Sequence, residues 1–205
     1  VSRTPHFGWL MEAEERNQSQ SAYQILVSTD TSLLKQNIGD IWNSGTVVSG
    51  QSIQIPFEGK NLRPGSVYYW KVKRWDKHQQ ESEWSRPDQF ITALFDKDDW
   101  KGAEWISYEQ MADSLVLVPG IHPWGKNVDA LAQRRPVIPM FRKEFTARKE
   151  IRSAMLFISG LGHYKAFING HAVSNDFLSP GWTDYHKTCL YNTFDVSNSL
   201  QRGKN

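Results

Sequence analysis

The stretch GLGHYKAFINGHAVSNDFLSPGWTDYHKTCLY, from Gly160 to Tyr191, decides the fold of the second half of the chain. Side chains over 164–168 alternate between two faces, which is the period of a strand. Asn169 and Gly170 follow at once, and such a pair supplies the positive φ angles of a two-residue hairpin turn. The stretch therefore predicts a β-hairpin with Asn169 and Gly170 as structural residues at its tip.

A long aromatic loop follows this hairpin. Residues 178–185 read Leu-Ser-Pro-Gly-Trp-Thr-Asp-Tyr. They cannot continue a ladder, because Pro180 has no N–H to donate and Gly181 breaks strands. Alternation predicts further strands at 154–158 and 190–194, and Asp195 is expected to cap a helical turn that reaches Leu200.

The hairpin and the loop together resemble the N-terminal β-sandwich domain of bacterial α-L-rhamnosidases. In that family a GLG-Y-x-x-x-I/L-N-G hairpin precedes L-x-P-G-W-T-D-Y-x-K, and both motifs occur here in that order and at that spacing. Residues 140–145, MFRKEF, resemble the family's FRKEF strand, so a strand is expected there. The resemblance implies an all-β fold in which this half is a jelly-roll or galactose-binding-like β-sandwich.

The first half carries a second informative block, LRPGSVYYWKV, at 62–72. Leu62, Pro64 and Tyr68 have the spacing of a tyrosine corner, in which the phenol reaches back to a nearby backbone group. Tyr68 and Trp70 are expected to be structural core residues rather than ligand contacts. The block and the strand spacing resemble a fibronectin type III domain, so a fibronectin-III or immunoglobulin-like sandwich is expected here.

Other strands of this half follow from alternation. Residues 21–28 predict a strand with one strongly apolar face, formed by Tyr23, Ile25 and Val27. Short strands are expected near 5–9, 42–48 and 52–56, and a helical turn at 33–38. The pair Trp84-Ser85 looks like half of the Trp-Ser box of cytokine receptors, a resemblance we reject because those receptors pair cysteines in this region and this chain has none there.

The domains are expected at 1–96 and 97–205, separated at the charged run Asp96–Asp99. Residues 108–138 lack periodicity and read as an irregular insertion, long for a loop inside a compact domain. In the resembled family the sandwich continues beyond Asn205, so the second domain is expected to be C-terminally incomplete, a fragment with an exposed sheet edge. Such an edge favours pairing into homo-oligomers.

Composition places few limits on function. The 205 residues carry a net charge of +2 with scattered Lys and Arg, which indicates neither a nucleic-acid groove nor a membrane surface. The single cysteine, Cys189, forbids an internal disulfide and leaves the compartment open. No apolar run approaches the ~18 residues of a membrane helix. The resemblance implies a bacterial parent that is periplasmic or extracellular, and a cytoplasmic one is not excluded.

Catalytic chemistry is not expected in this chain. Glycosidases use two carboxyl groups that flank the scissile bond, and in the rhamnosidase family these lie in an all-helical barrel domain after this region. No catalytic residue is therefore carried over. The six histidines show no zinc-site spacing, no Gly-rich loop precedes a helix, and no Ser/His/Asp elbow occurs.

Sugar binding is the sharper hypothesis for the aromatic loop. Trp182 and Tyr185 are candidates to stack on a pyranose, while Asn175, Asp176 and Asp184 are candidates to bind hydroxyls. Asp176 and Asp184 are also Ca²⁺ candidates, because Ca²⁺ prefers oxygen ligands and some sandwiches of this family resemble calcium-dependent rhamnose-binding modules. The structural alternative, which we favour, is that Trp182 plugs the end of the sandwich and Asp184 caps its own turn.

The resemblance implies a non-catalytic accessory region of an α-L-rhamnosidase-like glycoside hydrolase whose parent releases terminal α-L-rhamnose from glycans. Its expected partners are the catalytic barrel of the same protein, which it would scaffold, and a rhamnose-containing glycan. Two alternatives stay open, an autonomous calcium-dependent carbohydrate-binding module and a structural or adhesion module.

Overall fold

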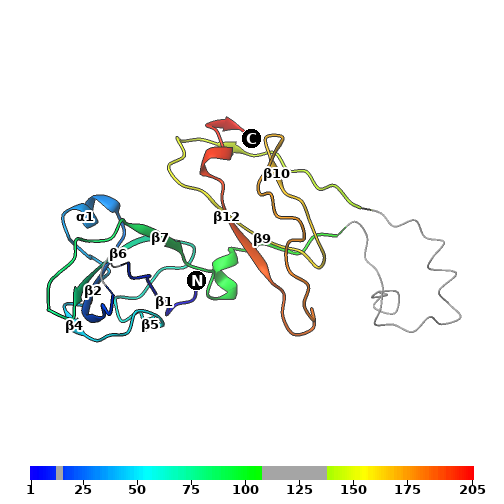
Figure 1. Cartoon of the computed structure of the whole chain (residues 1–205). Coiled ribbons are helices and arrows are strands. Elements are labelled where there is room, and N and C mark those ends of the chain that lie inside the picture. The colour runs from blue at the N-terminus through cyan, green and yellow to red at the C-terminus, as the bar shows by residue number, and fades with distance from the viewer. Residues whose placement is uncertain (13–15, 108–137) are drawn as a thin grey trace, which may run out of the picture. The chain divides into compact units, whose positions relative to one another are not determined.

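The computed structural model describes residues 1–12, 16–107 and 138–205 of the chain (Figure 1). The chain divides into two compact units, Val1–Gly102 and Ala103–Asn205. Both units are built from strands and carry only short helical turns, so the predicted all-β class is confirmed. Except for Ile138, the expected insertion at 108–138 lies outside the described residues.

Two antiparallel sheets form the first unit. The larger has the order β3 (Trp42–Asn43), β2 (Gln20–Ser28), β6 (Val67–Asp76) and β7 (Asp88–Ile91), and β4 (Val47–Val48) also pairs with β2. The smaller joins β1 (His6–Phe7) to β5 (Ile55–Pro56). These elements confirm the strands that alternation predicts in this half of the sequence.

The core of the first unit lies between these sheets. Phe7 of β1 is its centre, because its ring lies 4.9 to 6.4 Å from the rings of Trp42, Phe57, Trp70 and Phe90. The buried cluster comprises Phe7, Tyr23, Ile25, Val27, Ile55, Phe57, Leu62, Tyr68 and Val72. Burial of apolar surface on this scale is the main source of stability in a domain of about 100 residues.

The second face of β2 is also buried, which the alternation did not predict. Leu26 is 1% exposed, although it points away from Tyr23, Ile25 and Val27. The reason is α1 (Thr31–Lys35), which packs against β2 and β6 and buries Leu34 completely. Asp30 caps this helix by accepting a hydrogen bond from the Ser32 N–H at 2.7 Å.

A tyrosine corner closes one end of the first unit, as its sequence spacing predicts. Tyr68 is 3% exposed, and its phenol oxygen accepts a hydrogen bond from the Arg63 N–H at 2.9 Å. Thr92 lies beside it and donates to the Arg63 carbonyl at 2.6 Å. The loop before β6 is thereby fixed to both β6 and the end of β7.

The Trp84-Ser85 segment has a structural role along the edge of β6. Ser85 pairs with Val72 through its backbone N–H at 2.8 Å, and its hydroxyl accepts from the Val72 N–H at 3.1 Å. Two cations contact the Trp84 ring, with Lys71 Nζ at 4.7 Å and Lys73 Nζ at 5.1 Å from its centroid. Burial, followed by the charge of Lys73, lowers the pKa of Lys71 below its usual 10.5.

The first unit ends in a short 3₁₀ turn, η1 (Lys97–Trp100). The Asp99 carboxylate accepts from the Phe95 N–H at 2.7 Å and from the Asp96 N–H at 3.0 Å. The charged run therefore forms an ordered, capped turn, two residues before the first unit ends at Gly102.

The described residues of the second unit contain three antiparallel strand pairs. These are β9 (Met155–Ser159) with β12 (Tyr191–Asp195), β10 (Phe167–Ile168) with β11 (His171–Ala172), and β8 (Thr146–Ala147) with β13 (Gly203–Lys204). Figure 1 shows β9 and β12 as the long ribbon of this unit. The strands predicted at 154–158 and 190–194 are therefore confirmed.

Two details of the second unit differ from expectation or refine it. The strand predicted at 140–145 is wrong, because β8 begins only at Thr146 and the residues before it lie exposed. The turn predicted after Asp195 is present as a 3₁₀ turn, η3 (Ser197–Ser199). Asp195 stabilises it by accepting from the Ser197 N–H at 2.9 Å.

The second unit has little core of its own among its described residues, where only Pro180 and Val196 are buried. Its two described tryptophans reflect this, since Trp105 is 63% and Trp182 is 62% exposed. The first unit is the opposite, because all six of its tryptophans are half-buried: Trp9, Trp42, Trp70, Trp75, Trp84 and Trp100.

Candidate functional site

The hairpin predicted around Asn169 and Gly170 organises the candidate site. Ile168 pairs with His171 across the turn, and the two turn residues have φ values of 51° and 84°. These positive angles are those of the two-residue turn that Asn-Gly favours. The ladder extends one step further, because the Val173 N–H donates to the Ala166 carbonyl at 2.9 Å.

The polar side chains of Tyr164, Ser179 and Asn192 attach the aromatic loop to this hairpin and to β12. The Tyr164 hydroxyl donates to Asn192 Oδ1 at 2.8 Å, and the Ser179 hydroxyl donates to the same oxygen at 3.0 Å. The Tyr164 N–H also donates to the Ser179 carbonyl at 3.1 Å. Lys165 adds a hydrogen bond from Nζ to the Asp176 carbonyl. These hydrogen bonds fix the start of the loop to the residues just before β10 and to β12.

The electrostatics of this cluster keep Tyr164 neutral. Burial, assisted by the negative charge of Asp176, raises the pKa of Tyr164 from 10.0 to about 12. Its hydroxyl therefore remains a hydrogen-bond donor at any physiological pH, which is the form that the Asn192 carbonyl oxygen requires. The chemistry of the cluster is that of a fixed anchor rather than of an acid or base near neutrality.

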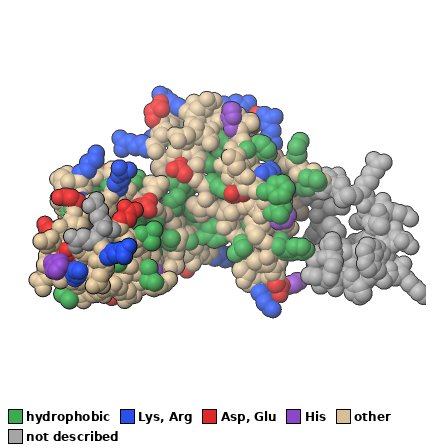
Figure 2. All heavy atoms as spheres, viewed as in Figure 1, with side chains coloured by type: hydrophobic (Ala, Val, Ile, Leu, Met, Phe, Trp, Pro, Cys, Tyr) green, Lys and Arg blue, Asp and Glu red, His purple; other side chains and the backbone are tan. Residues whose placement is uncertain are grey.

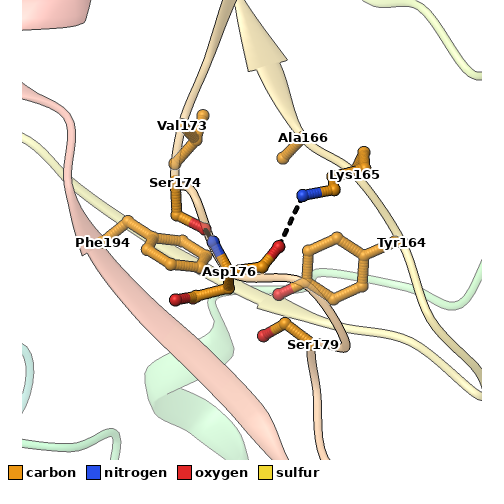
Figure 3. Close-up of a pocket in the computed structure, with 8 residues that line it drawn as sticks. All are labelled: Tyr164, Lys165, Ala166, Val173, Ser174, Asp176, Ser179 and Phe194. Carbon is orange, nitrogen blue, oxygen red and sulfur yellow. Dashed lines mark hydrogen bonds between the residues drawn. The ribbon is translucent and has the colours of Figure 1, made fainter.

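A small hollow opens beside the anchor and is lined by residues of the hairpin, the loop and β12. Figure 3 shows the Phe194 ring and the Tyr164 ring on opposite sides of Asp176. The space inside is about 10 Å³, which is room for one water molecule. A pyranose ring does not fit, so any sugar held here would lie against the outer surface of the loop. The lining residues are Tyr164, Lys165, Ala166, Val173, Ser174, Asp176, Ser179 and Phe194.

The predicted sugar contacts are not gathered at this hollow. Asp176 alone among them lines it, while Trp182 stands 62% exposed on the following part of the loop. The alternative in which Trp182 plugs the sandwich is therefore wrong. Tyr185 is half-buried and Asn175 is exposed.

Asp184 caps its own turn, as the structural alternative predicts. Its carboxylate accepts from the His186 N–H at 3.1 Å and lies 3.3 Å from Lys187 Nζ. Its carbonyl accepts from the N–H groups of Lys187 and Thr188, both at 2.9 Å. The carboxylate and the backbone carbonyl of Asp184 thus both accept hydrogen bonds within the turn.

Metal ligands do not converge in the part of the chain that the structure describes, where no three His, Cys, Asp or Glu side chains are grouped to hold an ion. Ca²⁺ takes six to eight oxygen ligands. Asp176 and Asp184 supply two carboxylates, of which the second is paired with Lys187.

The anchor residues were not singled out as site residues from sequence. Tyr164 and Asn192 both lie in stretches read only as alternating strands, and they are 28 positions apart. The sequence does contain one signal for the anchor, which is the amide of Asn192 within a predicted strand. An amide that faces an apolar environment rarely lacks a hydrogen-bond partner, so Asn192 indicates that a polar partner lies nearby.

Exposed hydrophobic side chains are the most extensive feature of the second unit. Figure 2 shows several of them on its visible face. Single exposed apolar residues are ordinary, whereas large exposed apolar surfaces mark places where another surface packs. The exposed large hydrophobic residues of this unit are Trp105, Ile106, Ile138, Met140, Phe141, Phe145, Leu161, Phe167, Phe177, Leu178, Trp182 and Leu190.

No helix among the described residues has the length and apolar character needed to cross a membrane.

An immunoglobulin-like unit followed by a second β-unit with a hairpin and a loop defines a β-sandwich protein of two units. The model of the Rha78A-like N-terminal immunoglobulin domain matches residues 1–96, and that of the α-L-rhamnosidase N-terminal domain matches 149–205. The two matches identify the chain as similar, in domain order, to the N-terminal region of α-L-rhamnosidases. The fibronectin type III assignment stays a prediction, because the first match is to an immunoglobulin domain.

Individual relatives agree with this family. An α-L-rhamnosidase of Formosa agariphila is 35% identical over 204 residues, which are 100% of this chain and 21% of the relative. The solved α-L-rhamnosidase from Dictyoglumus thermophilum is 36% identical with a TM-score of 0.80, over 99% of this chain and 22% of that one. A native α-L-rhamnosidase from Aspergillus terreus, 23% identical with a TM-score of 0.72 over 98% of this chain and 20% of its own, shares the fold. The chain spans about a fifth of these relatives.

Proposed function

We propose that this chain is a non-catalytic accessory region of an α-L-rhamnosidase-like glycoside hydrolase, periplasmic or extracellular in a bacterium, and that it scaffolds the catalytic barrel of the same protein. The observation that supports this is the second unit, whose described residues bury only Pro180 and Val196 while exposing twelve large hydrophobic side chains. Such a surface gains stability when more protein covers it, by roughly 25 cal/mol for each Å² of apolar surface removed from water.

The scaffold role is tested by association with a catalytic barrel. The purified chain is titrated with the separately produced barrel of a related α-L-rhamnosidase, and complex formation is followed by sedimentation. We expect a complex, and we expect the variant Phe141→Ser to weaken it, because Phe141 is one of the exposed residues of the second unit. Val48→Ser is the matched control, since Val48 is an exposed apolar residue of the first unit. A folded chain that does not associate would refute the scaffold role.

The expected absence of catalytic activity is tested separately. The purified chain is incubated with a chromogenic α-L-rhamnoside. No release is expected, because a glycosidase needs two carboxyl groups beside the scissile bond. The hollow of about 10 Å³ beside Tyr164 is lined by one carboxylate, Asp176, and the open hollow of about 600 Å³ beside β8 is lined by one, Glu150. Release that survives further purification would show that the chain itself is an enzyme.

A role in holding substrate is the second candidate, supported by the exposure of Trp182. An exposed aromatic ring on a loop whose start is anchored is suited to stack on a sugar face. Calorimetric titration with L-rhamnose, first with Ca²⁺ and then with EDTA, tests this role. Heat that Trp182→Ala removes would support it, and heat that EDTA also removes would support the calcium-dependent form. Flat traces from a folded chain would leave the scaffold role alone.

A further inference from the structure

Asn169 and Gly170 form the single Asn-Gly pair in the 205-residue sequence. Beyond shaping the turn, the Asn169 side chain has a second task. Its Nδ2 donates to the Ser199 carbonyl and to Asn205 Oδ1, both at 3.0 Å. These bonds join the tip of the β10–β11 hairpin to the segment that carries η3 and β13.

Asn205 is the residue that organises this segment. Its Oδ1 also accepts from the Gln201 N–H at 2.9 Å, and its Nδ2 donates to the Gln201 and Gly203 carbonyls at 2.8 and 3.0 Å. Its backbone pairs with Phe145 in both directions, at 2.9 and 3.1 Å. The Asn169 amide therefore attaches the hairpin to the residue that holds the β8–β13 pair in register.

The same pair carries a known chemical liability. The backbone nitrogen of an Asn-Gly bond can attack the preceding side-chain amide, because glycine has no side chain to obstruct it. Around Gly170 the turn is uncrowded, since nothing beyond its chain neighbours lies within 4 Å of the position that a Cβ would take. Asn169 itself is exposed to water.

We propose that Asn169 is a deamidation site that its hydrogen bonds to Ser199 and Asn205 hold back, and that its conversion releases the hairpin from the C-terminal segment. In the reaction the Gly170 nitrogen bonds to Asn169 Cγ, the Cγ–Nδ2 bond breaks, and the Gly170 amide proton leaves with Nδ2 as ammonia. Water then opens the cyclic imide at either carbonyl. One product has aspartate at this position, and the other has isoaspartate, whose main chain runs through the former side chain.

Both products remove the link for a simple electrostatic reason. The amide donates two hydrogen bonds, whereas a carboxylate can only accept. The new charge would face the Ser199 carbonyl and Asn205 Oδ1, two oxygens that are themselves acceptors. The isoaspartate product also lengthens the main chain within a two-residue turn, which that turn cannot accommodate.

The first experiment measures the rate. The folded chain and the chain in urea are incubated at mildly alkaline pH, and the peptide that contains Asn169 is followed by mass spectrometry. We expect slower conversion in the folded chain. The variant Asn205→Ala removes one acceptor of a single hydrogen bond, so conversion should accelerate by roughly two- to tenfold. The Asn43-Ser44 pair in the first unit serves as the internal reference and should not respond to Asn205→Ala.

The second experiment measures the consequence and remains informative if Asn205→Ala disturbs its own segment. Asn169→Asp reproduces one product, and hydrogen exchange at the amides of Phe145 and Asn205 reports the β8–β13 pairing. We expect faster exchange there and unchanged exchange at the β9–β12 ladder. Equal conversion rates in the folded and unfolded chain, or unchanged exchange in Asn169→Asp, would overturn the proposal. Neither result depends on whether the chain binds sugar or a barrel.

Discussion

The Tyr68 hydroxyl contributes one hydrogen bond to the first unit, and its removal should be measurable. In Tyr68→Phe the Arg63 N–H loses its acceptor in a half-buried position. An unsatisfied donor of this kind costs about 1 to 3 kcal/mol. We expect the urea midpoint to fall with an unchanged slope. Tyr69→Phe is the control, because the neighbouring side chain lies on the opposite face of β6 and should change stability by less than about 0.5 kcal/mol.

Asp40 makes the stability of the first unit depend on pH. Burial by itself raises the pKa of Asp40, but hydrogen bonds from Ser28 and Thr29 outweigh it, so the pKa lies below the usual 3.8. The carboxylate oxygens accept from the Ser28 hydroxyl and the Thr29 hydroxyl, both at 2.7 Å. A depressed pKa contributes stability that is present above 3.8 and is lost as the pH falls through the folded-state value.

Asp40→Asn should therefore lower the free energy of unfolding at neutral pH by about 1 kcal/mol. The difference from the parent chain should shrink as the pH falls below 3.8, because the parent then loses the same charge. Denaturant titrations at a series of pH values measure this, with the exposed Asp98→Asn as the control. A difference that stays constant at all pH values would contradict the assignment.

At the scale of single residues, the sequence predicts contacts between residues that are close in the chain. It does not predict contacts between residues that are far apart in the chain. The Asn169-Gly170 turn and the Tyr68 corner depend on residues within a few positions of each other, so their spacing predicted them. The bond between Tyr164 and Asn192 joins residues 28 positions apart. Nothing in either local stretch specified that partner, which only the pairing of β9 with β12 brings near.

Among the elements, β6 and the segment that follows it depend on Trp84. The ring is in contact with the ammonium groups of Lys71 and Lys73, and cation–π contacts contribute about 0.5 to 2 kcal/mol depending on desolvation. Trp84→Leu keeps an apolar side chain but removes the ring face, so we expect a loss of about 1 kcal/mol in thermal unfolding. Trp105→Leu is the control and should leave the midpoint unchanged, because Trp105 is exposed.

Alternation predicts a strand correctly when one of its faces is buried and a neighbouring strand pairs with it. It does not predict a helix that covers the second face, or the lack of a neighbouring strand. Residues 21–28 were predicted as a half-buried strand, but α1 covers the second face, and a contact of that kind is not encoded in strand periodicity. The MFRKEF segment has a sequence suited to a strand, yet the paired strand begins at Thr146. Pairing requires a neighbouring strand. Within the described residues, β13 pairs with Thr146 and Ala147, and Asn205 extends the pairing by one residue, to Phe145.

Over the whole molecule, the two units should differ in local stability. Apolar side chains of β2 and β6 are buried in the core of the first unit, whereas β9 and β12 contain no buried residue. Amides in well-buried ladders exchange at rates set by global unfolding, and those in poorly buried ladders exchange through local opening. We expect hydrogen exchange in the isolated chain to be slowest at Ile25 and Val72 and markedly faster at Phe157 and Thr193.

The same comparison tests the scaffold proposal from another direction. Addition of a catalytic barrel should slow exchange across β9 and β12 and leave β2 and β6 unchanged, because binding stabilises the surface that it covers. Equal protection of both units in the isolated chain would show that the second unit is stable without further protein.

The distribution of tryptophan gives the two units separate optical signatures. The six indoles of the first unit are half-buried and should emit at shorter wavelength, while Trp105 and Trp182 face water and should emit further to the red. The ninth tryptophan, Trp124, lies outside the described residues, so the measurement uses Trp124→Phe, in which iodide should quench Trp105 and Trp182 before the six indoles of the first unit. A ligand or a protein that covers the second unit should protect Trp105 and Trp182 from iodide and leave the emission of the first unit unchanged. Fluorescence lifetimes measured with iodide would therefore report binding to the second unit without a label.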